Sequence, residues 1–294
     1  MRIASVRFAD ARSPRPALVQ DGRVHDLAAL APDLPRDMTA LLGSGPGALG
    51  AAQRALEGAG AGLSVDEVAL APVVPRPGKF LALGMYYAAH IAELGRTAPE
   101  FQTWFNKQIT CANGPRSPVH RPRASEQLDY EGELGVIIGR RCRHVPRDRA
   151  FDVIAGYCVV NDLSVRDWQW RVPTFTLGKS WDTHGPMGPW LVTRDEIPDP
   201  HALTLRTWVN GELRQESTTG DMVFDIPAMI EHLSTAFTLE PGDVLATGTP
   251  SGVGGGFDPP RWLVPGDVVR VAIEGIGELV NEVILEPEDT AFIG

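Results

Sequence analysis

The sequence predicts an α+β fold that is mostly β-sheet, and three observations support this prediction. Apolar residues alternate at period two through residues 128–139, which is typical of a strand. The dipeptides Asp21-Gly22 and Asn210-Gly211 each lie between short strand-like runs, as in two-residue hairpins. Two Pro-Gly-Asp-Val turns, beginning at Pro241 and Pro265, each precede a further expected strand.

We expect two domains, a small N-terminal accessory domain (residues 1–72) and a larger domain (residues 73–294). The first opens with a strand and the hairpin at Asp21-Gly22. Ala- and Leu-rich helices are expected at 38–42 and 48–57, separated by a breaker rich in Gly, Ser and Pro. Nothing in this domain indicates chemistry, so the functional residues are sought after the proline-rich connector that follows it.

Composition excludes several classes of function. The 294 residues are 43% hydrophobic and carry 27 Lys and Arg against 37 Asp and Glu, a net charge of −10 with no basic stripe. We therefore expect neither nucleic acid nor membrane as a partner. The three cysteines form no Cys-x-x-Cys pair, and no long apolar segment begins the chain, so the sequence predicts a cytoplasmic protein without disulfides or a thiolate zinc site.

The strand at 128–139 places three acidic residues, Asp129, Glu131 and Glu133, on one face and apolar residues on the other. Neighbouring carboxylates repel, so they face open water, raise one pKa or share a cation. The apolar run that follows indicates that this strand is not a freely solvated edge. From the spacing alone, two interpretations remain open: an acidic face exposed to water, or a site for a divalent metal.

A second group of candidates follows an expected strand at 79–84. Helical character at 87–94 puts His90 and Glu93 on one helix face, where the carboxylate would orient the imidazole as a general base. A surface histidine beside a helix acid is the plain alternative. Residues 94–127 show little periodicity and are expected to be irregular, as lids and binding loops often are.

The apolar strand expected at 155–160 leads to Asp162, which is either a metal ligand or a helix N-cap. A helix over 163–170 would align Asp162, Arg166 and Gln169 on one face. The glycine-rich segment 246–256 lacks the Gly-Lys-Ser/Thr of a Walker A loop, but it would bring Thr249 and backbone N–H groups close to a ligand carboxylate.

Five ordered motifs between Lys79 and the C-terminus resemble those of the fumarylacetoacetate hydrolase family, which includes acylpyruvate and fumarylpyruvate hydrolases and 2-hydroxyhepta-2,4-diene-1,7-dioate isomerases. The motifs are Gly84-x-x-Tyr87-x-x-His90-x-x-Glu93, the Asp-Tyr-Glu-x-Glu-Leu strand from Asp129, the run from Gly156 to Gln169, Gly178-Lys179-Ser180-Trp181-Asp182-Thr183 with Gly188-Pro189-Trp190, and Gly248-Thr249-Pro250-Ser251-Gly252-Val253.

This resemblance implies a mixed β-roll or barrel-like catalytic domain, usually in a homodimer. It implies Mg²⁺ or Mn²⁺ on Glu131, Glu133 and Asp162, with Ca²⁺ as a substitute in crystals. All-oxygen ligands suit such hard cations. The implied substrates are 2-oxo or 2,4-dioxo acids, and the family positions that line the substrate site correspond to Tyr87, Lys107, Arg166, Gln169 and Thr249.

The implied reaction is metal-dependent hydrolysis of a C–C bond in an acylpyruvate through a metal-stabilised enolate. His90, oriented by Glu93, would take a proton from the attacking water, and Lys179 would stabilise the enolate charge. Isomerisation, tautomerisation or decarboxylation of 2-oxo acids on the same site is the alternative. A non-catalytic metabolite-binding protein is a more remote one.

The sequence departs from the family pattern beside the expected base. Tyr86 replaces a common Asn, Ala89 replaces an acidic or polar residue, and Leu83 stands where longer members carry an extra metal ligand. We therefore expect a three-carboxylate site completed by water. Substrate specificity is expected to depend on the segment 94–107 and on Trp168 and Trp170. The histidines expected to be structural are His144, His184, His201 and His232.

Overall fold

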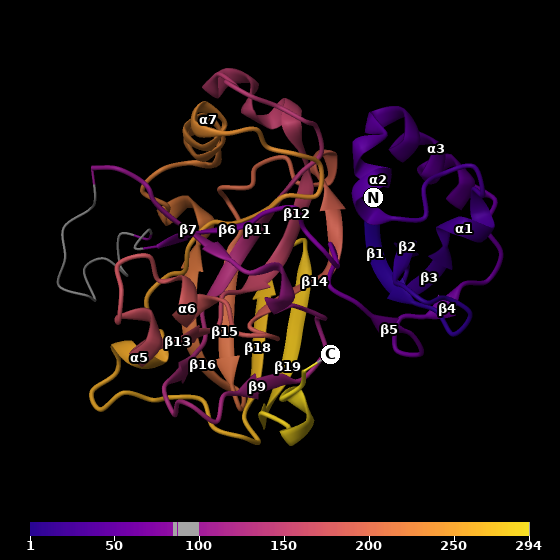
Figure 1. Ribbon diagram of the computed structural model, residues 1–294. Helices are drawn as coiled ribbons and strands as arrows, with labels where there is room; N and C mark the ends of the chain where they lie inside the picture. Colours follow the sequence, from indigo (N-terminus) through magenta and orange to yellow (C-terminus); the bar gives the residue numbers. More distant parts are fainter. Residues whose placement is uncertain (85–86, 88–99, 294) are drawn as a thin grey trace.

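The computed structural model describes residues 1–84, 87 and 100–293 (Figure 1). A twelve-stranded mixed sheet dominates it. Its strands are β1 (Arg2–Arg7), β2 (Arg15–Gln20), β3 (Arg23–Asp26), β4 (Leu63–Ser64), β5 (Ala69–Leu70), β6 (Phe80–Gly84), β7 (Thr103–Lys107), β8 (Ala112–Asn113), β11 (Gly132–Ile138), β12 (Ile154–Asn161), β14 (Gly185–Thr193) and β17 (Val244–Ala246).

The remaining strands form a five-stranded sheet and a two-stranded ladder. The five-stranded sheet contains β9 (Val119–Arg121), β15 (Thr204–Val209), β16 (Glu212–Thr218), β18 (Val268–Ile273) and β19 (Gly277–Leu285). The ladder pairs β10 (Leu128–Asp129) with β13 (Ser164–Val165).

The helices lie around the sheets (Figure 1). The α-helices are α1 (Leu27–Leu30), α2 (Met38–Gly43), α3 (Gly45–Glu57), α5 (Arg166–Gln169), α6 (Thr176–Lys179) and α7 (Ile226–Ala236). The 3₁₀ helices are η1 (Ile109–Cys111), η2 (Arg147–Val153), η3 (Arg194–Glu196), η4 (Thr219–Asp221), η5 (Gly254–Gly256) and η6 (Glu288–Thr290).

The main path of the large sheet runs in the order β4-β3-β2-β1-β14-β12-β11-β17-β6-β7. Within the described residues it does not return on itself, so the domain is an open, sheet-rich fold and not a closed barrel. The expected α+β, mostly β fold with mixed sheets is confirmed: β17 and β6 pair in parallel, whereas β11 pairs antiparallel with both β12 and β17.

Two cores lie on opposite faces of β11, as its alternation predicts. Leu134 and Val136 belong to the core between the two sheets, where Val271 of the smaller sheet also lies. Ile137 belongs to a second core that includes Leu41 of α2. Alternation puts Glu133 on the Ile137 face. The strand that carries the acidic residues is therefore buried on both sides.

Several local predictions are confirmed. The hairpin β2–β3 turns at Asp21 and Gly22, both with positive φ, and β15–β16 turns at Asn210-Gly211 in the same way. Positive φ at both central residues matches the twist of antiparallel strands, which explains why these dipeptides predict the turn. The expected helices at 38–42 and 48–57 correspond to α2 and α3. Only Ser44 separates α2 from α3, so the glycine-rich breaker is shorter than expected.

Three local predictions were wrong in their extent. The strand at 128–139 is interrupted at Tyr130 and Glu131, because Asp129 pairs with Ser164 whereas Gly132 pairs with Asn161. The segment 94–127 holds β7, β8 and β9 in its described part. The helix expected over 163–170 begins only at Arg166, since the preceding residues form β13. In each case pairing with a distant strand overrides the local pattern.

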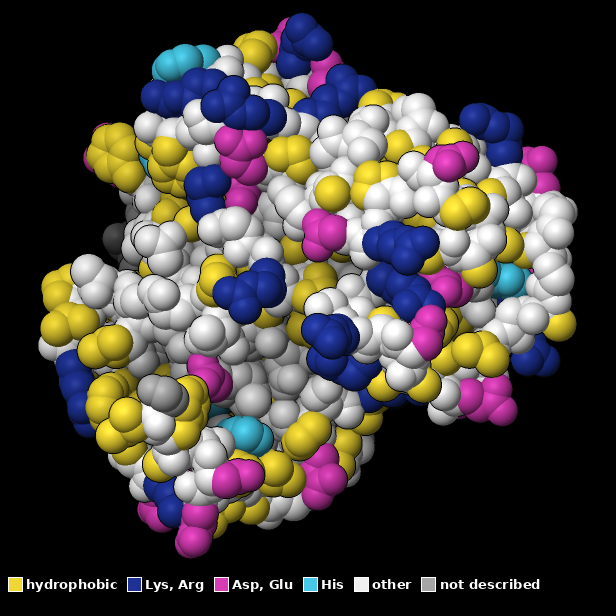
Figure 2. All heavy atoms as spheres, turned by 45° about the vertical axis from the view of Figure 1, so that its right-hand side comes forward, with side chains coloured by type: hydrophobic (Ala, Val, Ile, Leu, Met, Phe, Trp, Pro, Cys, Tyr) yellow, Lys and Arg dark blue, Asp and Glu magenta, His cyan; other side chains and the backbone are white. Residues whose placement is uncertain are grey.

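The N-terminal strands and α1–α3 lie to one side of the larger body (Figure 1). They are joined to it by backbone pairing, because Arg2 and Ile3 of β1 pair with Val192 and Leu191 of β14. One sheet thus runs through both expected domains, and the boundary at residue 72 stays a prediction. Figure 2 shows Lys and Arg side chains scattered among acidic and apolar ones on the face it displays. No helix of the described residues is long and apolar enough to cross a bilayer.

Candidate active site

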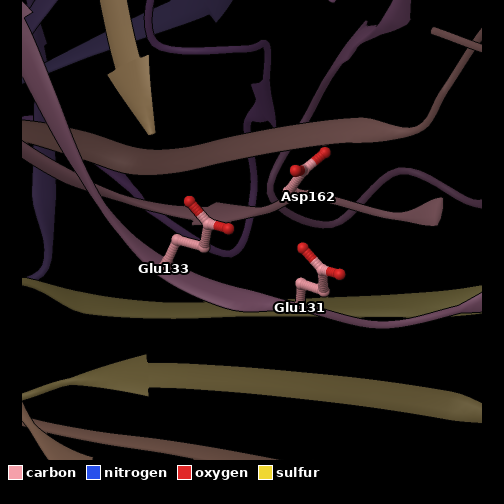
Figure 3. A group of neighbouring side chains, drawn as sticks. All are labelled: Glu131, Glu133 and Asp162. Atoms are coloured by element: carbon pink, nitrogen blue, oxygen red, sulfur yellow. The ribbon is translucent and has the colours of Figure 1, made fainter. Parts of the chain in front are cut away.

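Three buried carboxylates converge at the centre of the larger domain. Glu131, Glu133 and Asp162 each offer an oxygen, and these oxygens all lie within 4.8 Å of one another (Figure 3). The interruption before β11 positions Glu131, since its N–H donates to Asn161 Oδ1 (3.0 Å) and its carbonyl accepts from Asp162 N–H (2.8 Å). These two bonds fix the end of β12 against the start of β11, so side chains 31 positions apart in the sequence point into one space.

Glu133 is almost completely buried, with 1% of its surface exposed. Its Oε2 accepts a hydrogen bond from Gly248 N–H at 2.7 Å, from the glycine-rich segment. Burial, and next the carboxylates of Asp162 and Glu131, raise its pKa well above the ordinary value, while Lys179 and the Gly248 N–H oppose this in part. A buried carboxylate beside other carboxylates is stabilised by a bound proton or by a neighbouring cation.

Two buried lysines compensate the acidic cluster. Lys179 Nζ donates to Glu131 Oε2 (2.7 Å) and Asp162 Oδ2 (2.8 Å). Lys107 Nζ donates to Asp162 Oδ1 (2.6 Å) and contacts the backbone carbonyl of Lys179. Burial lowers the pKa of Lys179, but Asp162 and Glu131 outweigh this effect and hold it above its ordinary value. The Lys179 ammonium is therefore charged.

Arg166 lies beside the cluster and connects it to Asp129. Its Nε donates to Asp129 Oδ2 (2.8 Å), and its Nη1 contacts Glu131 Oε1 (2.6 Å) and Gln169 Oε1 (2.9 Å). Its Nη2 is buried without a hydrogen-bond partner in the described structure. A buried guanidinium nitrogen that lacks a partner is a ready donor for an anionic ligand.

These groups border a cavity of about 170 Å³. The polar part of its lining comprises Gln127, Glu131, Arg166, Gln169, Lys179 and Thr249. The rest comprises Leu83, Gly84, Phe105, Trp170, Phe175, Val253, Gly255 and Trp262. A larger hollow of about 450 Å³ lies between the N-terminal helices and the main body, and none of the predicted site residues lines it.

The structure brings together most of the predicted site residues. Arg166, Gln169, Lys179 and Thr249 line the cavity, with Thr249 Oγ1 held by Gly132 O (2.9 Å) and Gln215 Nε2 (2.8 Å). Lys107 is buried against Asp162 and does not line the cavity. His90 and Glu93 lie outside the described residues.

Three further predicted residues differ in whether they line the cavity. Tyr87 is fully buried, pairs with Met222 in an isolated bridge and does not line the cavity. Burial, with Glu133 and Asp221 nearby, raises its pKa. Trp170 lines the cavity, whereas Trp168 packs edge-on against Trp181, with ring centres 5.0 Å apart, away from it.

Sequence reasoning missed three residues of this site. Asp129 receives N–H groups from Gly254 (2.7 Å) and Gly255 (2.9 Å) in addition to Arg166. Gln215, from the smaller sheet, links Thr249 to Gly132 N–H (3.0 Å). Phe175 lines the cavity with a left-handed backbone, φ 60°. Only Asp129 had a sequence signal, its place on the acidic strand face.

The cluster suits a divalent cation by the chemistry of its donors. Glu131, Glu133 and Asp162 supply only carboxylate oxygens, which hard cations such as Mg²⁺ and Mn²⁺ prefer. Asp129 adds a fourth carboxylate, and the cations in contact with the four are Lys107, Lys179 and Arg166. With all four carboxyl groups ionised, these described residues sum to one negative charge, which a bound divalent cation would change to one positive charge.

The family model described as fumarylacetoacetate (FAA) hydrolase C-terminal matches residues 79–284, more than half of the chain. The chain belongs to this family. A member from Burkholderia multivorans, provisionally named a hydrolase, is 44% identical over 276 residues, which cover 93% of this chain and 96% of that relative. The sequence resemblance is thus confirmed over residues 79–284.

Solved structures of other family members have the same fold. Maleylpyruvate hydrolase of Sphingobium, solved with manganese(II) and pyruvate, has a TM-score of 0.82 and 33% identity, covering 98% of this chain and all of that one. The 2-hydroxyhepta-2,4-diene-1,7-dioate isomerase of Mycobacterium marinum has a TM-score of 0.76 and 30% identity over the same shares. Hydrolases and isomerases of this family are both similar to the chain.

Proposed function

We propose that this family member hydrolyses a C–C bond in a 2,4-dioxo acid of the acylpyruvate type and depends on Mg²⁺ or Mn²⁺. The observation that carries the proposal is the grouping of three buried carboxylates with the Lys179 ammonium and the Arg166 guanidinium beside one cavity. The cation, bound by Glu131, Glu133 and Asp162, would supply Lewis acidity for the 2-oxo acid end of the substrate.

Arg166 binds the C1 carboxylate in this proposal. Its Nη2 is the buried donor that lacks a partner, and Asp129 and Glu131 hold the guanidinium in place. Gln169 accepts from Nη1 at 2.9 Å and so fixes the plane of the group. An acid anchored in this way presents its distal carbonyl to the rest of the cavity.

Lys179 stabilises the charge that develops on the pyruvate half. Two of its three N–H bonds contact Glu131 and Asp162, which leaves one donor for the substrate. Water adds to the C4 carbonyl, the C3–C4 bond breaks, and the electron pair passes to the pyruvate enolate, which is then protonated at C3. His90, oriented by Glu93, is proposed as the base that takes the proton of the water.

The second candidate is isomerisation of a related 2-oxo acid without attack by water, and decarboxylation belongs to the same group. The similarity to the isomerase of Mycobacterium marinum favours this alternative. The two reactions differ in whether His90 and Glu93 deliver water or only move protons.

Product analysis in ¹⁸O-labelled water tests the proposal. The Mg²⁺- or Mn²⁺-loaded protein is given a panel of acylpyruvates and oxaloacetate, with an EDTA-treated control. Pyruvate and an ¹⁸O-labelled carboxylic acid, both absent after EDTA, are the expected products. Carbon dioxide from oxaloacetate, or a product of unchanged mass with shifted absorbance, would replace hydrolysis by decarboxylation or isomerisation.

We also propose a homodimer in a reducing compartment, the cytoplasm. Cys111, Cys142 and Cys158 are all free thiols in the structure, which supports a protein that needs no oxidising environment. Sedimentation analysis of the intact chain tests the dimer, for which the expected mass is twice the 31.8 kDa of one chain.

A further inference from the structure

We propose that the substrate is a 2,4-dioxo monocarboxylic acid with an uncharged, apolar distal substituent, and that Trp170 and Phe175 set this preference. The inference rests on the proposed function, since it concerns the same cavity. It goes beyond that function by naming the class of acid that the cavity accepts.

An aromatic wall leads away from the Lys179 ammonium. Its Nζ lies 5.0 Å from the centre of the Phe105 ring. The Phe105 ring meets Phe175 edge-on at 6.0 Å, and Phe175 meets Trp170 edge-on at 5.4 Å. All three rings line the cavity. Edge-to-face contacts hold such rings in fixed orientations, so the wall is a continuous apolar surface.

The wall and the charged end of the cavity are built by the same short helix. Phe175 precedes α6, and its carbonyl accepts from the N–H groups of Gly178 (2.9 Å) and Lys179 (3.2 Å). An alanine Cβ at Gly178 would lie 2.3 Å from Gln169 N, so α6 is packed directly on α5, which Trp170 follows. The aromatic wall therefore has a fixed position relative to Lys179.

A second part of the cavity lining is also apolar. Val253 and Trp262 line it, and Val253 is buried. A Cβ at Gly255 would lie 3.2 Å from the Trp262 ring, so the glycine-rich segment packs closely on this tryptophan. The N–H groups of Gly254 and Gly255 bind Asp129, which anchors the segment. The distal part of a bound acid would lie against these two apolar parts of the lining.

The charges of the described lining favour a single carboxylate on the substrate. Its only cations are Arg166 and Lys179, and both already contact Glu131. The N–H groups of Arg166 and Lys179 that do not contact protein carboxylates would bind the C1 end of the acid. A second carboxylate against these apolar surfaces would meet no cation of the described lining, and an unpaired charge is costly wherever it is shielded from water. The one positive charge left by a bound divalent cation also balances one carboxylate and not two.

A matched pair of ligands tests the preference without any reaction. The acids 2-oxohexanoate and 2-oxoadipate have the same chain length and differ in a terminal methyl against a carboxylate. Neither has a 4-oxo group, so neither undergoes the proposed cleavage. Titration calorimetry on the Mn²⁺-loaded protein should show 2-oxohexanoate binding about tenfold or more tighter, the discrimination expected when a buried charge lacks a partner.

Variants at the wall locate the preference. Trp170→Lys should bring the affinity ratio close to one or reverse it, while Trp170→Phe should retain it. Leu177→Lys is the matched control, because Leu177 is on α6 and 59% exposed but does not line the cavity. It should leave the ratio unchanged. A ratio that moves equally in Trp170→Lys and Leu177→Lys would overturn the assignment to the cavity wall.

Equal or tighter binding of 2-oxoadipate by the wild-type protein, or binding of neither acid, would overturn the inference. The ¹⁸O experiment judges the proposed function separately. Apolar preference without hydrolysis would leave this inference standing and reject the hydrolase, whereas hydrolysis with a preference for 2-oxoadipate would do the reverse.

Discussion

Asp129 and Arg166, 37 positions apart in the sequence, form a buried ion pair at 2.8 Å. Asp129 also accepts the N–H groups of Gly254 and Gly255, so one carboxylate holds both the proposed substrate-binding guanidinium and the glycine-rich segment. This carboxylate is fully buried and hydrogen-bonded on both oxygens. It therefore acts as a positioning residue for two sides of the cavity.

Asp129→Asn should impair both stability and binding. Losing the anion beside buried Arg166 should lower the free energy of unfolding by about 3 kcal/mol. The loosened guanidinium should raise KM about tenfold. Urea unfolding and steady-state kinetics measure the two effects. Glu216→Gln is the control, because its pair with Arg206 is about half exposed and should contribute less than about 1 kcal/mol. An Asp129→Asn protein that behaves like this control would contradict the positioning role.

Lys179→Ala should reduce kcat about a hundredfold, or about 3 kcal/mol, if Lys179 is one preorganised donor to the developing enolate. Lys79→Ala is the matched control, since Lys79 also pairs with a buried acid, Asp243 at 2.8 Å, but lies away from the cavity. Its turnover should equal that of the wild type. Near wild-type turnover in Lys179→Ala would remove the role.

Glu133→Gln should weaken Mn²⁺ binding about tenfold or more, measured by electron paramagnetic resonance of the free ion. Glu126→Gln is the control, because this carboxylate is 88% exposed and should not affect the ion. In the wild type, the raised pKa of Glu133 means that binding displaces a proton. Affinity should therefore increase as pH rises, and an affinity independent of pH would speak against Glu133 as a ligand.

His184 should make the fold acid-sensitive. Burial lowers its pKa to about 3, and its Nε2 lies 2.7 Å from the carbonyl of His120. Its pKa in the folded state is below the ordinary 6.5, so its contribution to stability is complete above pH 6.5 and is lost as pH falls toward 3. The slope should be about 1.4 kcal/mol per pH unit.

Urea unfolding between pH 7 and pH 4.5 measures this slope, and His184→Gln should reduce it. The exposed His232→Gln variant should retain the wild-type slope. If both variants keep the same slope, other groups cause the acid sensitivity and His184 does not.

The sequence by itself determined the local features of this protein. Period-two alternation placed Leu134 and Val136 in one core, and Glu133 on the opposite face. The dipeptides Asp21-Gly22 and Asn210-Gly211 predicted their turns, since φ preferences act within a few residues. The ordered motifs also predicted the family. These features could be predicted because the face on which a strand side chain lies and the conformation of a turn depend on residues close in sequence.

Tertiary structure alone decided how the candidate site is assembled. The interruption at Tyr130–Glu131 depends on pairing with β12 and β13, and it brings Glu131 to Asp162. Lys107 pairs with buried Asp162, and Phe175 joins the aromatic wall. Such contacts join residues tens of positions apart, and their geometry depends on strand register and on packing between sheets. A pattern read along one segment carries no information on either.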